Sequence, residues 1–259
     1  MKRRALLCAV LACVILAVAC STTQRQAYLA LGDSYAVGEG ASHAEATGYV
    51  PLFRSFLESD TGKKLSLRNL AVGGETSASM IAKGQLAKAL AELEFRNQDS
   101  DPQNDVLIIT IDIGGNDVRD LALEGRPCAP PTPTTGAACT TAAADAIEDM
   151  SENLTVILRA LRVAAGPDIR IFVLDYFNPY SGTSQPLNAA GEAILPILNG
   201  KIKSVAATPG INADLVETFA DFEGKGADLT HVTEAGGDFH PNDAGYRLLA
   251  DLLTAAYER

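Results

Sequence analysis

The segment DVLIITI, residues 105–111, decides the fold class of this 259-residue chain. After its first residue every side chain is aliphatic or β-branched, which is typical of a strand buried on both faces of a sheet. Such strands belong to parallel sheets that carry helices on both sides. Four other segments also read as strands: YLAL (28–31), KLSLRNLAV (64–72), IRIFVLD (169–175) and INADLVE (211–217).

Helical patterns separate these strands along the chain. The third helical stretch ends at Gly166-Pro167, a regular helix stop signal. Strands that alternate with helices predict an α/β domain, with a parallel sheet between two helical layers, over residues 27–259. The helical stretches are residues 48–59, 78–95, 143–166, 186–207, with an interruption expected at Pro196, and 241–257.

The composition is that of an acidic globular protein. Hydrophobic residues make up 47% of the chain, which is enough for a sizeable core. The 21 basic residues against 32 acidic ones give a formal net charge of -11, and Trp is absent. This charge and the scarcity of aromatic side chains argue against nucleic-acid binding and against stacking platforms for bases or sugars.

Residues 1–19 have the layout of a secretory signal peptide. Three basic residues, Lys2 to Arg4, precede an apolar run that ends at Ala19. Ala17-Val18-Ala19 is a site for an ordinary signal peptidase, but the same bond precedes Cys20 in LAVAC, which resembles the lipobox of bacterial lipoproteins. We expect export, with lipidated Cys20 and a polar tether over residues 20–26. A secreted form without lipid and a retained membrane anchor are the alternatives.

The remaining cysteines support this interpretation. Removal of the signal peptide leaves Cys20, Cys128 and Cys139, an odd number for an exported protein. Acylation of Cys20 leaves an even pair, which flanks a loop rich in Pro and Thr. We expect a disulfide between Cys128 and Cys139, which suits an oxidising compartment, and two unpaired loop thiols are the alternative. A chain this acidic gains nothing from anionic lipids, so membrane attachment depends on the acyl anchor.

Three predicted strand ends carry residues that suit acyl transfer. Ser34 follows Gly32-Asp33, where the first strand leaves the sheet, so its hydroxyl can face a cleft. Gly73-Gly74 follows the second strand and can aim backbone N–H groups at an oxyanion. Asn116 follows the third strand in Gly114-Gly115-Asn116-Asp117 and can donate its side-chain amide, while Asp117 braces the loop. Each segment taken alone also reads as an ordinary turn.

A serine nucleophile needs a base, and the chain offers only three histidines. His240 precedes Pro241, which can start the last helix, so His240 is expected at the lip of the cleft. His43 lies in a loop and reads as a surface residue, and His231 lies in a polar stretch without a neighbouring motif. Scattered histidines without a cysteine cluster give no ligand spacing for a metal, and we expect none.

The segments GDSY, VGGETS, GGND and FHPN, in this order, resemble the four blocks of the SGNH/GDSL hydrolase family. The resemblance spans nearly the whole chain after the signal peptide. It implies a flavodoxin-like, three-layer α/β/α fold with five parallel strands in the order 2-1-3-4-5. It also implies hydrolysis of esters, thioesters or acetylated sugars without a cofactor. By this match Ser34 is the nucleophile and His240 the base, and the oxyanion hole consists of Ser34 N–H, Gly74 N–H and the Asn116 side chain.

One position departs from the family pattern. The family places an aspartate three residues before the histidine, where this chain has Gly237, and Asp238 comes two residues before His240. Asp238 can orient the imidazole if the loop absorbs the shift by one residue. A backbone carbonyl near Gly237, or a carboxylate from elsewhere such as Asp228 or Glu234, can serve instead.

The sequence therefore predicts a serine hydrolase of carboxylic esters. Its substrate is a small-molecule, lipid or acylated-sugar ester, with no nucleic-acid partner and no membrane contact besides the lipid anchor. Walls of the acyl pocket are expected from the Cys128–Cys139 segment and from residues 176–180. The alternatives are a carbohydrate O-deacetylase on the same fold and a catalytically inactive, ligand-binding surface lipoprotein.

Overall fold

A computed structural model describes residues 25–129, 136–185, 187–235 and 237–259. The expected signal peptide, Cys20 and most of the tether lie outside these ranges. The described chain contains a sheet of five parallel strands in the order β2-β1-β3-β4-β5, so the predicted fold class and strand order are confirmed. The strands are β1 (Ala27–Gly32), β2 (Ser66–Asn69), β3 (Val106–Asp112), β4 (Arg170–Leu174) and β5 (Asp214–Val216).

The core lies on both faces of the central strands. Every residue of β1 is buried, and β3 pairs with β1 on one side and β4 on the other. Ile109 and Ile111 of β3 are fully buried, as expected of the segment whose aliphatic run predicted a two-sided strand. The carboxyl ends of these strands therefore start from a rigid platform.

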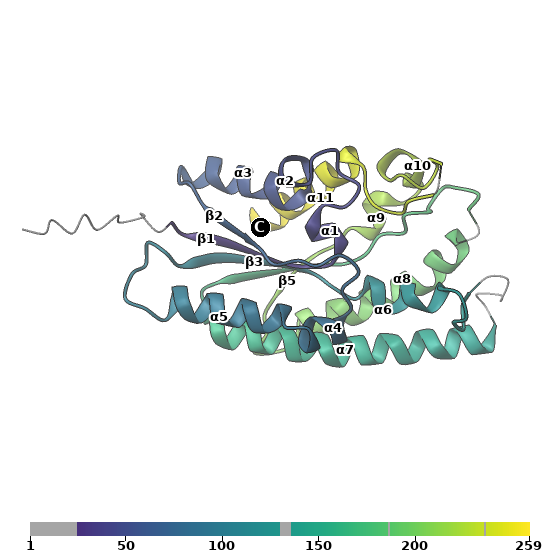
Figure 1. Ribbon diagram of the computed structural model, residues 1–259, viewed down its shortest axis with the longest axis horizontal. Helices are drawn as coiled ribbons and strands as arrows, with labels where there is room; N and C mark the ends of the chain where they lie inside the picture. Colours follow the sequence, from purple (N-terminus) through teal and green to yellow (C-terminus); the bar gives the residue numbers. More distant parts are fainter. Residues whose placement is uncertain (1–24, 130–135, 186, 236) are drawn as a thin grey trace, which may run out of the picture.

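Helices cover both faces of the sheet (Figure 1). The longer helices α3 (Tyr49–Thr61) and α11 (Asp243–Tyr257) lie on one face, and α5 (Gln85–Asn97), α7 (Ala137–Ala165) and α8 (Asn188–Ala206) lie on the other. None of the helices in the described part of the chain combines the length and the apolar character needed to cross a bilayer. The shorter helices are α1 (Ser34–Val37), α2 (Ala44–Thr47), α4 (Ser77–Ala82), α6 (Gly115–Arg119), the 3-10 helix η1 (Asp120–Ala122), α9 (Phe219–Phe222) and α10 (Gly226–Leu229).

Two helix predictions were wrong in detail. The helix expected over residues 78–95 is two helices, α4 and α5, because the chain turns at Gly84, whose φ is 89°. The interruption expected at Pro196 does not occur, and α8 continues through it. The side chain of Asn199, just beyond this proline, accepts a hydrogen bond from Tyr176 N and donates one to Tyr176 O, which fixes the helix against the end of β4.

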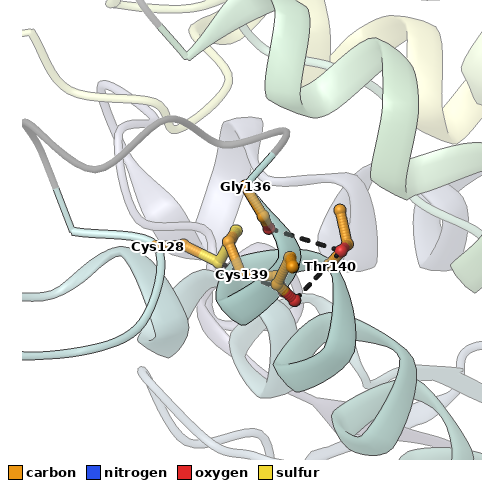
Figure 2. Close-up of a disulfide and its surroundings, with 5 residues drawn as sticks. Cys128, Gly136, Cys139 and Thr140 are labelled. Carbon is orange, nitrogen blue, oxygen red and sulfur yellow. Dashed lines mark hydrogen bonds between the residues drawn. A yellow bond between two sulfur atoms is a disulfide. The ribbon is translucent and has the colours of Figure 1, made fainter.

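Helix α7 begins at Ala137, earlier than its apolar pattern predicted, and a disulfide fixes its first turn. Cys128 and Cys139 are joined with a Cα–Cα distance of 4.8 Å, which confirms the expected pair (Figure 2). Both cysteines are buried. Near the same turn, Thr140 Oγ1 donates to the carbonyl oxygens of Gly136 and Ala137. The disulfide thus ties the segment after η1 to the start of α7.

Replacement of Cys128 and Cys139 by serine together should lower the free energy of unfolding by about 2–3 kcal/mol, because the cross-link closes a short loop and restricts the unfolded chain. Urea denaturation of the oxidised protein and of the double variant measures the difference. Dithiothreitol should reduce the stability of the wild type and leave the double variant unchanged. Equal denaturation midpoints for the oxidised wild type and the variant would contradict a stabilising role.

Candidate active site

Ser34 is the first residue of α1, directly after the end of β1. Asp33 caps this short helix, because its Oδ1 accepts the N–H of Tyr35 at 3.0 Å. Ser34 O accepts the N–H groups of Gly38 and Glu39, both at 3.0 Å. The serine is therefore held in a tight turn at the carboxyl edge of the sheet, with 4% of its surface exposed.

Gly32 makes this turn close enough to the central strand. Its φ is 141°, and a Cβ at this position would overlap the side chain of Asp112 at the end of β3. The side chain of Gln85 holds the same residue by two hydrogen bonds: Gly32 N donates to Gln85 Oε1 at 2.8 Å, and Gln85 Nε2 donates to Gly32 O at 3.1 Å. Only glycine fits this position.

Two buried carboxyl groups lie under the serine turn. Asp33 N donates to Asp112 Oδ1 at 2.8 Å, Tyr49 OH donates to Asp112 Oδ2 at 2.5 Å, and Tyr176 OH donates to Asp33 Oδ2 at 2.7 Å. Burial raises the pKa of Asp33 to about 6. Burial and the neighbouring charge of Asp33 also raise the pKa of Asp112 well above its usual range. The folded protein therefore holds protons on this pair at a pH where ordinary carboxyl groups have lost them.

The loops after β2 and β3 bring further donors to the same edge. Gly74 has a φ of 71°, which favours glycine. Asn116, on α6, is buried, and its Nδ2 donates to Glu75 O at 3.0 Å and to Asp33 Oδ2 at 3.4 Å. Asp117 links the two loops, since its carboxylate accepts the N–H of Ser77 at 2.9 Å and the hydroxyl of Ser77 at 2.6 Å. Asp117 is thus a brace, as its place in the sequence suggested.

His240 lies in the loop before α11, where Asp238 contacts its ring. His240 Nδ1 lies 2.6 Å from Asp238 Oδ1, which also accepts the backbone N–H of His240 at 3.1 Å. Burial opposes ionisation of Asp238, but the His240 backbone N–H and imidazole outweigh it and lower its pKa. Because a carboxylate only accepts, the proton of a neutral imidazole lies on Nδ1 and the lone pair on Nε2.

The other groups considered for this contact lie elsewhere. Glu234 Oε1 accepts from His231 Nδ1 at 2.5 Å, and Asp228 is exposed on α10. Gly237 N donates to Glu234 O. The shift by one residue relative to the family pattern is therefore absorbed by the loop backbone, which brings Asp238 to the imidazole.

Several contacts join the loop after α1 to the loop that carries His240. The rings of Tyr35 and His240 pack edge to face at 6.2 Å between centroids. A Cβ at Gly40 would come within 2.8 Å of His240 Cβ. His231 Nε2 donates to Gly40 O at 2.8 Å, and because its Nδ1 faces the Glu234 carboxylate, both ring nitrogens meet acceptors. The Glu234 hydrogen bond raises the pKa of His231, whereas His43 is exposed.

The structure thus brings the serine turn and the histidine loop into contact. Among the described residues His240 Nε2 makes no hydrogen bond, and the carboxylate oxygen Glu39 Oε2 faces it at 3.4 Å. Within the described ranges no group of three or more His, Cys, Asp or Glu residues could hold a metal ion.

A mainly apolar pocket of about 150 Å³ opens beside Ser34 and Asn116. Cys128 and residues 176–180 line it, as the sequence predicted. Helix α8 and the residue before it supply a wall that the sequence interpretation missed, although the spacing of these side chains follows one helical face. This wall consists of Leu187, Ala190, Gly191, Ile194 and Leu195.

Comparisons with known proteins agree with this geometry. A family model described as GDSL-like lipase/acylhydrolase matches residues 30–248. The search of curated protein sequences found no match.

Solved structures share the fold. The lipase Lip_vut3 from a goat rumen metagenome superposes with a TM-score of 0.68 at 20% identity, over 89% of this chain and 97% of the other. Phospholipase A1 from Streptomyces albidoflavus NA297 gives 0.61 at 21% identity, over 90% and 99%. The acetylxylan esterase Axe2 from Geobacillus stearothermophilus gives 0.58 at 18% identity, over 90% and 95%. At these identities the similarity establishes a common fold.

The raised carboxyl pKa values predict a pH dependence of stability. The folded state holds a proton on Asp33 that the unfolded chain releases above its ordinary pKa of 3.8. The stability contributed by this proton is therefore complete below about pH 4 and is lost as the pH rises through about 6. Relative to Asp33→Asn, the wild type should lose about 1–3 kcal/mol of unfolding free energy between these limits.

Urea denaturation at pH 4.5 and pH 7.5 measures this difference. Asp251→Asn, which changes an exposed carboxylate on α11, is the matched control and should follow the wild type. A constant gap between wild type and Asp33→Asn across this range would show that the carboxyl pair does not retain its proton.

Proposed function

Because the chain belongs to the GDSL-like lipase/acylhydrolase family, we propose that it is a serine hydrolase that cleaves carboxylic esters. The observation that supports this most is the contact of the serine turn with a histidine whose Nδ1 faces Asp238, beside an apolar pocket. Ser34 is the proposed nucleophile, His240 the general base and Asp238 the residue that orients it.

In the proposed acylation step, Ser34 Oγ attacks the ester carbonyl carbon while His240 Nε2 takes the hydroxyl proton. Asp238 keeps the other imidazole proton on Nδ1 and stabilises the imidazolium that forms. The carbonyl oxygen becomes an oxyanion, which accepts hydrogen bonds from Ser34 N–H, Gly74 N–H and Asn116 Nδ2. Asn116 is suited to this, because its contact with Asp33 at 3.4 Å is weak and leaves one amide hydrogen available.

The tetrahedral intermediate then collapses. The bond to the alcohol oxygen breaks, and His240 returns its proton to that oxygen, so the alcohol leaves and an acyl-Ser34 ester remains. A water molecule repeats the sequence: His240 removes its proton, its oxygen attacks the acyl carbon, and Ser34 is regenerated with release of the carboxylic acid.

The pocket favours substrates with an apolar acyl group. It is lined by aromatic and aliphatic side chains from three different segments, and it extends from Ser34 to α8. An acetyl group would fill little of it, so we place acyl esters ahead of acetylated carbohydrates. Activity that is highest on acetylated xylan and falls with longer acyl chains would support the carbohydrate alternative instead.

We also propose export and attachment through a lipid on Cys20. The acidic surface offers no attraction to anionic lipids, so an acyl anchor is the attachment that suits this chain. Strand β1 begins at Ala27, at the end of the sheet opposite to Ser34 (Figure 1). A tether that enters there would leave the active-site loops on the far side of the domain. Palmitate labelling in a bacterial host, with Cys20→Ser as the unlabelled control, tests this placement.

Replacement of Ser34 by alanine should abolish ester hydrolysis, with a loss in kcat of about four orders of magnitude or more. His240→Ala should lose about as much, because the two residues act as one unit, and Asn116→Ala should lose on the order of 10²–10³-fold. The assay uses residues 21–259 and p-nitrophenyl butyrate and octanoate. A fluorophosphonate probe should label the wild type and not Ser34→Ala. Unchanged turnover in Ser34→Ala would refute the assignment.

Replacement of Asp238 by asparagine should lower kcat by on the order of 10³–10⁴-fold with little change in KM, since the amide no longer selects the reactive tautomer. Asp228→Asn and Glu234→Gln are matched controls, because both remove a nearby carboxylate that does not contact His240. If either control lost activity while Asp238→Asn kept it, another group would orient the imidazole.

A further inference from the structure

Glu39 has a fixed backbone beside the proposed catalytic histidine. Its N–H donates to Ser34 O at 3.0 Å, and its carbonyl oxygen accepts the hydroxyl of Tyr246 at 2.5 Å. Two loops therefore determine where its side chain starts. The carboxylate extends to His240, with Oε2 at 3.4 Å from Nε2.

The other carboxylate oxygen of Glu39 packs against Gly73. A Cβ at Gly73 would overlap Glu39 Oε1, so the carboxylate occupies space that only a glycine leaves open. Gly73 directly precedes Gly74, the proposed oxyanion donor. The Glu39 carboxylate thus lies between the imidazole and the glycine loop, where a substrate must enter to reach both.

This position corresponds to the alcohol side of an ester. In the proposed mechanism His240 Nε2 delivers its proton to the leaving alcohol, so that oxygen must approach Nε2. The acyl pocket is lined by Ser34, Asn116 and the aromatic residues beyond them, and Glu39 is not among its lining residues. The acyl and alcohol parts of a bound ester would therefore contact different groups, and Glu39 is a first contact of the alcohol.

The charges around the alcohol side are acidic. Glu39 is half-exposed, with 44% of its side chain accessible, and its ion pair within the described residues is with His240. Asp238 lies on the other side of the same ring. The cationic Arg119 lies over the Phe239 ring at 4.7 Å, and both residues line the acyl pocket. A carboxylate accepts hydrogen bonds from hydroxyl groups, attracts cations and repels anions.

We propose that Glu39 determines leaving-group specificity: it favours esters of cationic or neutral, hydroxyl-rich alcohols and disfavours esters whose alcohol carries a phosphate or carboxylate. This inference rests on the proposed ester hydrolase function and adds the class of alcohol that the site accepts.

Three butyrate esters with one acyl group test this proposal: butyrylcholine, monobutyrin and 1-butyrylglycerol 3-phosphate. Their short chains keep them dissolved as monomers. For the wild type we expect kcat/KM to be lowest for the phosphate ester, about 10-fold or more below monobutyrin. Glu39→Gln keeps the shape and removes the charge, so it should reduce this discrimination by about 3- to 10-fold and also reduce the preference for butyrylcholine.

Glu94→Gln is the matched control. Glu94 is exposed on α5, and its replacement changes the net charge equally without touching the site. It should retain the wild-type order of substrates. Addition of 0.5 M NaCl should narrow the wild-type discrimination, because exposed charges are screened.

Two results would overturn the proposal. In one, Glu39→Gln retains the wild-type ratio between the phosphate ester and monobutyrin. In the other, it lowers kcat/KM for all three esters equally and moves the pH profile, which would make Glu39 a positioning residue for His240. Hydrolysis of p-nitrophenyl butyrate that depends on Ser34 would show in either case that the ester hydrolase function itself is intact. Without that hydrolysis, the function proposal fails first.

Discussion

The hydrogen bond from Asp33 N to Asp112 Oδ1 connects the serine turn to the central strand. It is buried, it spans two neighbouring strands, and it requires Gly32, because any side chain at that position would overlap Asp112. The turn that presents Ser34 therefore has the rigidity of the sheet itself. The cost is a pair of carboxyl groups in a site without water contact, which Tyr49 and Tyr176 offset by hydrogen bonds.

The strand order explains why the polar residues meet where they do. In a sheet of order 2-1-3-4-5 the connections from β1 and β3 leave toward opposite faces, and a crevice opens between their carboxyl ends. Ser34 follows β1 and Asn116 follows β3, so both border this crevice. The glycine loop after β2 comes from the neighbouring strand. Strand ends are readable from hydrophobic runs, and for this reason the sequence predicted both the fold class and the residues that gather at the edge.

The features that the sequence did not predict depend on loop backbone and side-chain direction. Asp238 and Glu234 are equally plausible acids by composition, and only the backbone of the loop decides which one reaches His240. The apolar face of α8 looks the same in sequence whether it packs in the core or lines a pocket. Glu39 carries no motif, since its importance arises from its distance to His240 in space. Local propensity also misjudged Pro196, because tertiary contacts maintain the helix around it.

The two halves of the site differ in how they are held. The nucleophile and the oxyanion donors are fixed by the sheet, whereas His240 depends on a narrow antiparallel bridge between Thr230 and Pro241 and on the cap of α11. Asn242 supplies that cap and also donates to Asp228 O, so it joins the histidine loop to both α10 and α11. Since α11 packs on α3 against the sheet, the position of the imidazole depends on one polar side chain at a helix N-terminus. Local opening of this loop would separate base from nucleophile without unfolding the core.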